Sequence, residues 1–278
     1  MNTNIPDIEK FIAKSNFNKI FILSGKNSFY KTGANKIFDK ILKKKKFVLY
    51  LKKNYLPEYS ELKEIIISKD KFNPDLIIAI GGGCVMDLAK ISSVFSLKKN
   101  LKNKIKNSDF STKINRVLAI PTTAGSGAES TSNAVIYINN IKYSVEGKEI
   151  KPDFFCLMPR LLLSSNKKLD GTAAFDAMSQ SIESLFSLKS NKESIFYAKK
   201  GLTILLKNRK SFFNKKNLIN AHQMAIGANL SGKAISISKT IAPHALSYSF
   251  TTMFGVPHGH AVSLSLNKIL KLNFFNQK

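Results

Sequence analysis

The sequence predicts an α/β protein in which an N-terminal domain with a parallel sheet is followed by an all-helical domain. Short apolar runs alternate with amphipathic helical segments through residues 1–155, which is typical of a parallel sheet joined by helices. Three consecutive glycines directly follow one of these runs. Residues 156–278 carry helical periodicity with few strand-like runs. We therefore expect two domains, 1–155 and 156–278, with a ligand-binding cleft between them.

Four short apolar runs mark the expected strands. Each run is too short for a helix and rich in β-branched or aromatic residues. The strands are expected at residues 19–24, 47–51, 75–80 and 117–120. Helical segments between strands favour right-handed crossovers and a parallel sheet. The Lys- and Asn-rich residues 96–113 are expected to form an exposed loop.

Four segments of the second half carry the periodicity of amphipathic helices. They are residues 175–187, 192–206, 217–231 and 241–254. These helices would form the second domain.

The composition argues against several classes of protein. Of 278 residues, 44 are basic and 18 acidic, a net charge of +26, but the only arginines are Arg116, Arg160 and Arg209. Arginine is the usual reader of bases and phosphates, so we attribute the charge to compositional bias and expect no nucleic-acid partner. There is no apolar run that could span a membrane, no evident signal peptide and only two cysteines. A cytoplasmic protein without a membrane partner is expected.

The stretch after the third expected strand is a candidate anion site. Residues 77–80 end the strand, residues 81–83 are all glycine, and helical spacing begins at Val85. Bare glycine backbone lets a ligand approach closely, and the free N–H groups at a helix N-terminus attract a phosphate. Three glycines can also form a simple tight turn, so this stretch alone leaves both interpretations open.

A second glycine-rich turn follows the fourth expected strand. It reads Pro-Thr-Thr-Ala-Gly-Ser-Gly over residues 121–127, with two hydroxyl groups and two glycines that would let a backbone pass close to a ligand. An ordinary Gly/Ser loop is the alternative. Because the two turns follow consecutive strands, we expect them side by side at one edge of the sheet, where they could hold two halves of a dinucleotide.

These two motifs together resemble the iron-containing (group III) alcohol dehydrogenase family. The resemblance covers essentially the whole chain, and it implies a Rossmann-like domain followed by a helical domain, as in dehydroquinate synthase-like proteins. The family normally has serine at the position of Cys84. By resemblance, the first turn holds the cofactor pyrophosphate and the threonine loop lies beside the nicotinamide ribose. The residues implied in cofactor binding are Gly82, Gly83, Cys84, Asp87, Thr122, Thr123 and Lys142.

The resemblance also implies a metal site in the helical half. Asp176, His244 and His258 match family ligands in their sequence context, and a carboxylate with two imidazoles suits Fe²⁺ or Zn²⁺. Gln180 stands where the family usually has a histidine, and it is a poor, neutral ligand. Either a three-ligand site with an open position results, as in the related glycerol dehydrogenases, or the site is degraded. His260 could replace the missing imidazole or relay a proton. We favour the three-ligand site, with His260 as a catalytic proton relay or as a residue that supports the ligands from behind.

The implied activity is hydride transfer between NAD(P)H and a small aldehyde, giving an alcohol. Residues 51–54 (Leu-Lys-Lys-Asn) end the second strand without the acid that would bind a ribose 2′-hydroxyl, so NADPH is tolerated. The motifs around Asp176, His244 and His258 look most like the phosphonoacetaldehyde reductase (hydroxyethylphosphonate dehydrogenase) branch, whose aldehyde substrate carries a phosphonate. A homodimer is also expected.

Two alternatives stay open at this point. One is a lyase of the dehydroquinate synthase type, and the other is a non-catalytic nucleotide-binding relative. Family members continue past the last histidine motif with further helices, whereas this sequence ends at Lys278. We therefore expect a shortened helical domain or a fragment.

Overall fold

A computed structural model describes residues 3–275, and the chain forms two compact units. The first comprises Met1–Thr122 and Ala128–Ser164 and is called the sheet unit; the second comprises Thr123–Gly127 and Ser165–Lys278 and is called the helical unit. The predicted fold class, a parallel sheet domain followed by an all-helical domain, is confirmed. The functional division predicted after residue 155 stays a prediction.

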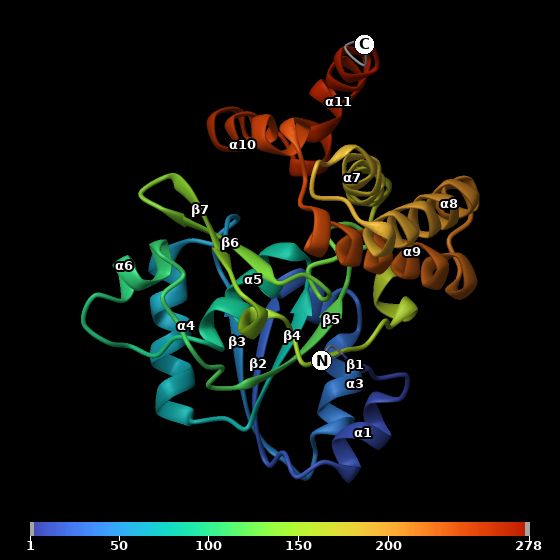
Figure 1. Ribbon diagram of the computed structural model, residues 1–278. Coiled ribbons are helices and arrows are strands. Elements are labelled where there is room, and N and C mark those ends of the chain that lie inside the picture. Colours follow the sequence, from blue (N-terminus) through green and yellow to red (C-terminus); the bar gives the residue numbers. More distant parts are fainter. Residues whose placement is uncertain (1–2, 276–278) are drawn as a thin grey trace. The chain divides into compact units, whose positions relative to one another are not determined.

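The sheet unit is built on six parallel strands in the order β1-β8-β5-β4-β2-β3 (Figure 1). The four long strands are those that the sequence predicts. Their bounds are Lys19–Gly25 (β2), Lys46–Lys52 (β3), Leu76–Gly81 (β4) and Arg116–Pro121 (β5). The two-residue strands β1 (Thr3–Asn4) and β8 (Phe154–Phe155) extend the sheet beyond β5.

Both faces of this sheet are buried, which explains why its strands are continuous apolar runs. Alternate residues of a strand point to opposite faces, so Phe21 and Ile77 join one core while Ile20 and Ile78 join the other. Two groups of helices cover these faces (Figure 1). They are α4 (Tyr59–Phe72) and α5 (Gly83–Ser92) on one face, and α1 (Ile8–Lys14), α2 (Lys26–Tyr30) and α3 (Ala34–Ile41) on the other.

A β-hairpin that the sequence analysis did not anticipate lies between β5 and β8. It pairs β6 (Asn133–Ile138) with β7 (Ile141–Glu146) in antiparallel register. Asn139 and Asn140, the two turn residues, have positive φ angles of 52° and 62°. Asparagine tolerates this conformation, and a two-residue turn with both φ angles positive suits a hairpin. The Asn-Asn pair between apolar residues was the available signal.

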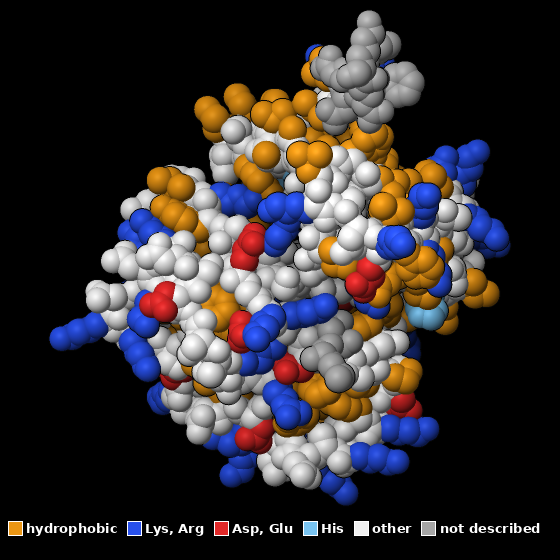
Figure 2. Space-filling view, viewed as in Figure 1, with side chains coloured by type: hydrophobic (Ala, Val, Ile, Leu, Met, Phe, Trp, Pro, Cys, Tyr) orange, Lys and Arg blue, Asp and Glu red, His pale blue; other side chains and the backbone are white. Residues whose placement is uncertain are grey.

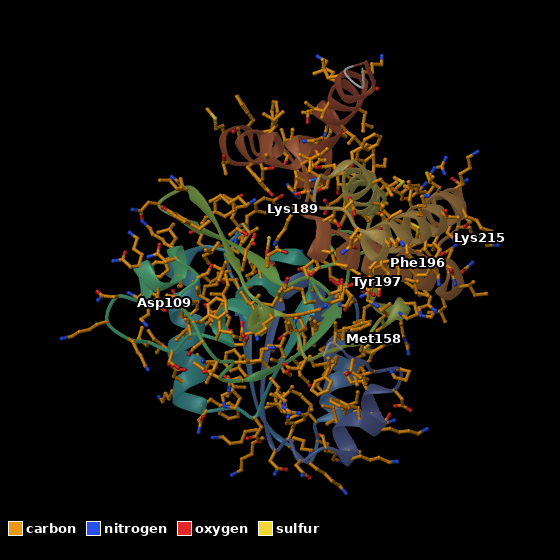
Figure 3. All side chains as sticks on the ribbon, viewed as in Figure 1. Asp109, Met158, Lys189, Phe196, Tyr197 and Lys215 are labelled. Atoms are coloured by element: carbon orange, nitrogen blue, oxygen red, sulfur yellow. The ribbon has the colours of Figure 1, made fainter. Side chains whose placement is uncertain are left out.

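The stretch predicted as a loop, residues 96–113, contains a short helix, α6 (Leu101–Lys106). Leu101 and Ile105 are buried in the core, which is why this lysine-rich segment is ordered. Asp109, labelled in Figure 3, follows the helix and forms a 3.2 Å ion pair with Lys104. Two 3₁₀ helices, η1 (Lys148–Ile150) and η2 (Pro159–Leu162), complete the sheet unit.

The helical unit contains five long helices: α7 (Lys167–Phe186), α8 (Lys192–Asn214), α9 (Leu218–Ser238), α10 (Ala242–Phe254) and α11 (His258–Phe275). Asn166, Asn191 and Asn217 accept hydrogen bonds from first-turn N–H groups and so begin α7, α8 and α9. The first three helices pack on one another, and α11 packs on α10 and α7. The sequence predicts the first four helices but not α11.

The face of the molecule shown in Figure 2 carries many basic side chains. Lys and Arg side chains occur in many separate places on the face shown in Figure 2. Within residues 3–275, none of the helices combines the length and the apolar character needed to cross a membrane.

Candidate metal and cofactor sites

The predicted anion site lies where β4 runs directly into α5. Gly82 is the N-cap of this helix, and no hydrogen bond from its own side chain is possible. The first N–H groups of α5, at Gly83 and Cys84, therefore have no capping side chain and lie where an anion would bind. Gly81 is needed for packing, because a Cβ atom there would lie 2.6 Å from Cγ2 of Val85.

The threonine loop begins beside the glycine turn, as the strand order predicts. Gly81 and Pro121 are register partners on β4 and β5, and the N–H of Thr122 donates to the Gly81 carbonyl at 3.0 Å. The Thr122 hydroxyl also donates to the hydroxyl of Ser28 at 3.3 Å. Thr122 thus ties together three chain segments at the carboxyl edge of the sheet.

The rest of this loop, from Thr123 to Gly127, belongs to the helical unit. A Cβ atom on Gly125 would lie 3.0 Å from Ala173 of α7. Gly127 has a φ angle of 58°, and a Cβ atom there would lie 2.6 Å from the Cα atom of Gly232 on α9. These two glycines are therefore required for packing on helices, a reason that differs from the ligand approach expected from the sequence.

Asp87 and Lys142 are two predicted cofactor residues of the sheet unit that affect each other's charge. Burial raises the pKa of Asp87 to about 6, although Lys90, the Val135 N–H and Lys142 lower it in part. Burial also lowers the pKa of Lys142 to about 7, against the opposing effect of Asp87 and Glu146. Two predicted cofactor residues thus titrate near neutral pH, where each responds to the charge of the other.

Cys84, at the start of α5, replaces the serine that is usual in the related motif. Burial and the nearby Asp87 raise the pKa of its thiol to about 11. The thiol is therefore neutral at physiological pH and is not an activated nucleophile.

An acid from α4 lies at the end of β3, the segment that bears on cofactor choice. Glu61 is 2% exposed and accepts hydrogen bonds from the backbone N–H groups of Lys53 and Asn54. The buried amino group of Lys52 lies 4.0 Å from the same carboxylate. Lys53 is paired with Glu64. Both lysines of this segment therefore have partners within the sheet unit.

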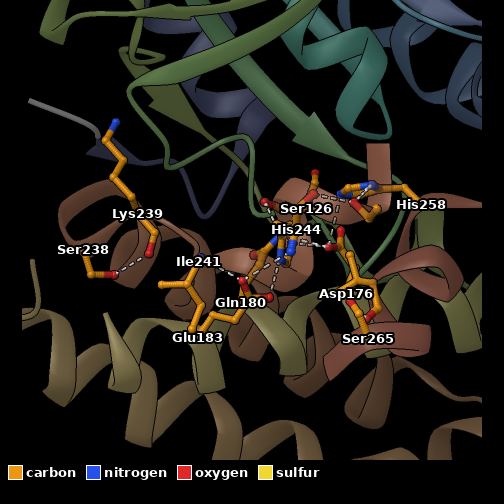
Figure 4. A network of polar contacts seen from close by, with 12 residues as sticks. Ser126, Asp176, Gln180, Glu183, Ser238, Lys239, Ile241, His244, His258 and Ser265 are labelled. Carbon is orange, nitrogen blue, oxygen red and sulfur yellow. Dashed lines mark hydrogen bonds and ion pairs between the residues drawn. The ribbon is translucent and has the colours of Figure 1, made fainter. Parts of the chain in front are cut away.

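Asp176, His244 and His258 come together in the helical unit (Figure 4). One ligand atom from each lies within 4.8 Å of the others, so a single ion could contact all three. Nε2 of His244 is 3.1 Å and Nε2 of His258 is 3.9 Å from Oδ1 of Asp176. This is the only group of three or more acidic, His or Cys ligands with metal-binding geometry among the described residues.

Three helices contribute these ligands, and a glycine lets them meet. Asp176 lies on α7, His244 in the first turn of α10 and His258 at the first residue of α11. Gly259 packs so tightly on α7 that a Cβ atom would lie 1.9 Å from the Thr172 carbonyl oxygen and 3.1 Å from Cβ of Asp176. The His258 ring stacks on Tyr248 at 5.6 Å, and its Nδ1 is 3.3 Å from the Ser247 hydroxyl.

Glu183, which the sequence analysis did not single out, lies behind His244. Its fully buried carboxylate is hydrogen-bonded to Nδ1 of His244, on the opposite side of the ring from Asp176. Burial by itself would lower the pKa of His244, but the hydrogen bonds to Asp176 and Glu183 raise it to about 9. Glu183 follows Asp176 by seven residues, two helical turns on the same face, and this spacing was the available signal.

Gln180 lies one helical turn after Asp176, as the motif predicts. Its amide nitrogen donates to Oδ1 of Asp176 at 3.2 Å and to the carbonyl of Ser126 at 3.4 Å. Its oxygen, Oε1, is buried and has no hydrogen-bond partner among the described atoms. Burial by itself would raise the pKa of Asp176, but His244, His258 and Gln180 together lower it, so the carboxylate is charged.

His260 lies outside the three-residue group. It is exposed, and on α11 it is two residues from His258. Side chains two positions apart on a helix point roughly 200° apart, so His260 does not share the face of His258. Its predicted role as a proton relay stays a prediction.

Comparison with known proteins supports one family along the whole chain. Residues 2–159 match the family model described as iron-containing alcohol dehydrogenase, and residues 172–278 match the C-terminal model of the Fe-containing alcohol dehydrogenase family. The six strands of the parallel sheet and the metal group thus each fall within a segment matched by this family.

Individual relatives agree with this result, and a solved structure has a similar fold. The chain is 30% identical over 211 residues to phosphonoacetaldehyde reductase of Streptomyces viridochromogenes, covering 72% of this chain and 53% of the relative. It is 27% identical over 281 residues to 4-hydroxybutyrate dehydrogenase of Clostridium kluyveri, covering 96% and 74%. The structure of sulfoacetaldehyde reductase from Bifidobacterium kashiwanohense in complex with NAD⁺ has a similar fold, with a TM-score of 0.90 at 20% identity over 98% of this chain and 75% of that one.

The chain spans about half the length of the phosphonoacetaldehyde reductase that it matches. The first family model alone covers more than half of this chain, and the second covers most of the remainder. The chain therefore belongs to the iron-containing alcohol dehydrogenase family.

Proposed function

We propose that this protein is a metal-dependent NAD(P)H oxidoreductase that interconverts a small aldehyde and an alcohol. The observation that carries this proposal is the convergence of Asp176, His244 and His258 in a chain of this family. The uncapped N-terminus of α5 supports the cofactor half of the proposal, because it suits a pyrophosphate.

The donor set fits a transition metal. One carboxylate oxygen and two imidazole nitrogens are the ligands of open catalytic sites for Zn²⁺, and they also suit Fe²⁺. A divalent ion bound there would supply a Lewis acid that polarises the carbonyl group of the substrate. The Oε1 atom of Gln180, which has no hydrogen-bond partner among the described atoms, makes this residue a candidate additional ligand beside the three-ligand set that the sequence favours.

The chain's own residues bind and orient the reactants. We assign pyrophosphate binding to Gly82, Gly83 and Cys84 at the start of α5, with Thr122 beside them, and nicotinamide ribose binding to the loop that continues with Thr123. Asp87 and Lys142 would lie near the cofactor. Reduced nicotinamide supplies the hydride. The family resemblance further leads us to propose a homodimer.

The proposed substrate is an aldehyde that carries an anionic group, with phosphonoacetaldehyde as the first candidate. The support is the 30% identity to phosphonoacetaldehyde reductase and the similarity of the motifs around Asp176, His244 and His258. NADPH is as suitable a candidate cofactor as NADH, because β3 ends at Lys52, Lys53 follows it, and the strand has no acid of its own at this end.

The test is a panel of aldehydes with both reduced cofactors. Metal-free protein is reconstituted with Fe²⁺ or Zn²⁺, and cofactor oxidation is followed with phosphonoacetaldehyde, sulfoacetaldehyde and propanal. We expect metal-dependent oxidation that the variant Asp176→Asn lacks. A folded, metal-loaded protein that oxidises no cofactor would contradict the proposal, and turnover without net oxidation would instead indicate a lyase.

A further inference from the structure

The carboxylate of Glu183 has two oxygens with separate tasks. Oε1 is hydrogen-bonded to Nδ1 of His244. Oε2 accepts hydrogen bonds from the backbone N–H of Ile241 at 2.8 Å and from that of His244 at 3.4 Å. The side chain is fully buried, so these contacts replace all of its hydration.

We propose that Glu183 is a positioning residue that keeps Nε2 of His244 available to a metal ion; this inference rests on the proposed function. A carboxylate oxygen only accepts hydrogen bonds, so Nδ1 of the ring must carry a proton. When the ring loses its second proton, the lone pair that a metal needs is therefore on Nε2, which faces Asp176 at 3.1 Å. A carboxylate behind a ligating histidine fixes both the tautomer and the orientation of the ring.

The same carboxylate also begins the helix that carries His244. Ile241 is the N-cap of α10 and has no side chain that can accept a hydrogen bond, so Glu183 of α7 serves the helix end instead. The connection before it passes through Lys239 with φ 64° and ψ 171°, a conformation that only glycine adopts readily. One acid therefore holds both the ring and the start of α10 after this unfavourable turn.

The variant Glu183→Gln separates these two tasks. Glutamine has nearly the same volume, but it offers one acceptor and one donor. Since the backbone N–H groups can only donate, the amide oxygen should face them and leave the NH₂ group toward Nδ1. The ring would then carry its proton on Nε2, where it opposes metal binding, while α10 keeps its hydrogen bond.

The experiment measures Co²⁺ and Zn²⁺ binding to the full chain by chelator competition, together with the visible spectrum of bound Co²⁺. We expect Glu183→Gln to weaken binding by about 10- to 100-fold and to change the Co²⁺ spectrum. Asp170→Asn is the matched control, because Asp170 is also a buried acid of α7 but is bonded to Ser165 and Lys216. That variant should unfold at a lower temperature and keep the affinity and the spectrum of the original protein.

Each outcome of this experiment supports or overturns the proposed role of Glu183 in metal binding. Unchanged affinity and spectrum in folded Glu183→Gln would overturn the inference and leave Glu183 as a helix cap, with the proposed function intact. An original protein that binds neither ion would contradict the proposed function and this inference together. If Glu183→Gln does not fold, Glu183→Asp replaces it: this variant keeps the charge but is one methylene shorter, and unchanged metal affinity there would equally overturn the inference.

Discussion

The ring of His244 lies between two buried carboxylates, so a proton and a metal ion compete for its Nε2 atom. Asp176 and Glu183 raise the pKa of this histidine to about 9, well above the ordinary value of 6.5. The metal-free protein therefore holds a charged imidazolium at neutral pH, and metal binding must release its proton.

The first prediction concerns the pH dependence of metal affinity. Between pH 6.5 and 9 we expect Zn²⁺ affinity to rise about tenfold per pH unit, because one proton leaves His244 on binding. Over the same pH window the metal-free protein should become less stable. The raised pKa of His244 contributes its full stabilisation below the pKa of the unfolded state, and this stabilisation is lost as the pH rises through the pKa of the folded state. Chelator competition and thermal unfolding at several pH values measure these effects. A flat affinity profile would show that His244 releases no proton.

The second prediction concerns Gln180, one turn from Asp176. Gln180→His would place an imidazole where a buried amide oxygen now has no partner among the described residues. We expect Zn²⁺ affinity to increase by roughly tenfold or more, because a fourth strong ligand completes a tetrahedral set. Chelator competition measures the Zn²⁺ affinity, with Gln180→Leu as the control that removes the amide oxygen and nitrogen. Equal affinities for all three proteins would mean that this position does not face the ion.

At the scale of elements, the metal group depends on how closely α11 crosses α7. His258 begins α11, and the next residue, Gly259, presses against the backbone of α7 beside Asp176. Any side chain at residue 259 would push the two helices apart and carry His258 away from Asp176. The absence of a side chain at residue 259 thus allows His258, the third ligand, to reach Asp176.

The third prediction tests this crossing with a matched pair of variants. Gly259→Ala should destabilise the protein by about 1–3 kcal/mol and weaken metal binding, because the added Cβ overlaps the Thr172 carbonyl. Gly171→Ala on α7 meets nothing within 4 Å and should stabilise the helix by about 0.5–1 kcal/mol without changing metal affinity. Thermal unfolding and metal titration compare them. Equal metal affinity in both variants would show that the contact at residue 259 does not position His258.

At the scale of the whole molecule, the candidate cofactor turn and the candidate metal ligands belong to different compact units. Gly81, Gly82 and Gly83 lie in the sheet unit, whereas Asp176 and His244 lie in the helical unit. Each unit has its own packed interior, so a local change in one should leave binding in the other largely unaffected.

The fourth prediction is that cofactor and metal binding can be lost separately. Asp176→Asn should lose metal binding and keep NADPH affinity within about twofold. Gly81→Ala should show the reverse, because its Cβ would collide with Val85 and displace the first turn of α5. Fluorescence titration with NADPH and chelator competition measure both affinities. Joint loss in either variant would show that the two sites are energetically coupled.

Several features of the molecule could be predicted because their causes are local. The four long strands are apolar runs buried on both faces, and the glycine turn follows one of them directly. The strand order that places Thr122 beside Gly81 follows from the parallel α/β pattern. The hairpin over residues 133–146 escaped notice because lysine and asparagine weaken its alternating pattern. The short α6 is ordered only through burial of Leu101 and Ile105 in the core.

The sequence by itself determined the fold class and the glycine turn before α5, and its resemblance to a known family pointed to the three candidate metal ligands. Only the tertiary structure decided which acid lies behind His244, because Glu183 and His244 are 61 residues apart and meet through the packing of α7 with the start of α10. It also gave Gly125, Gly127 and Gly259 their roles as close helix contacts. Periodicity is a local property of a chain, whereas the partner of a buried carboxylate depends on which distant segments of the chain pack together.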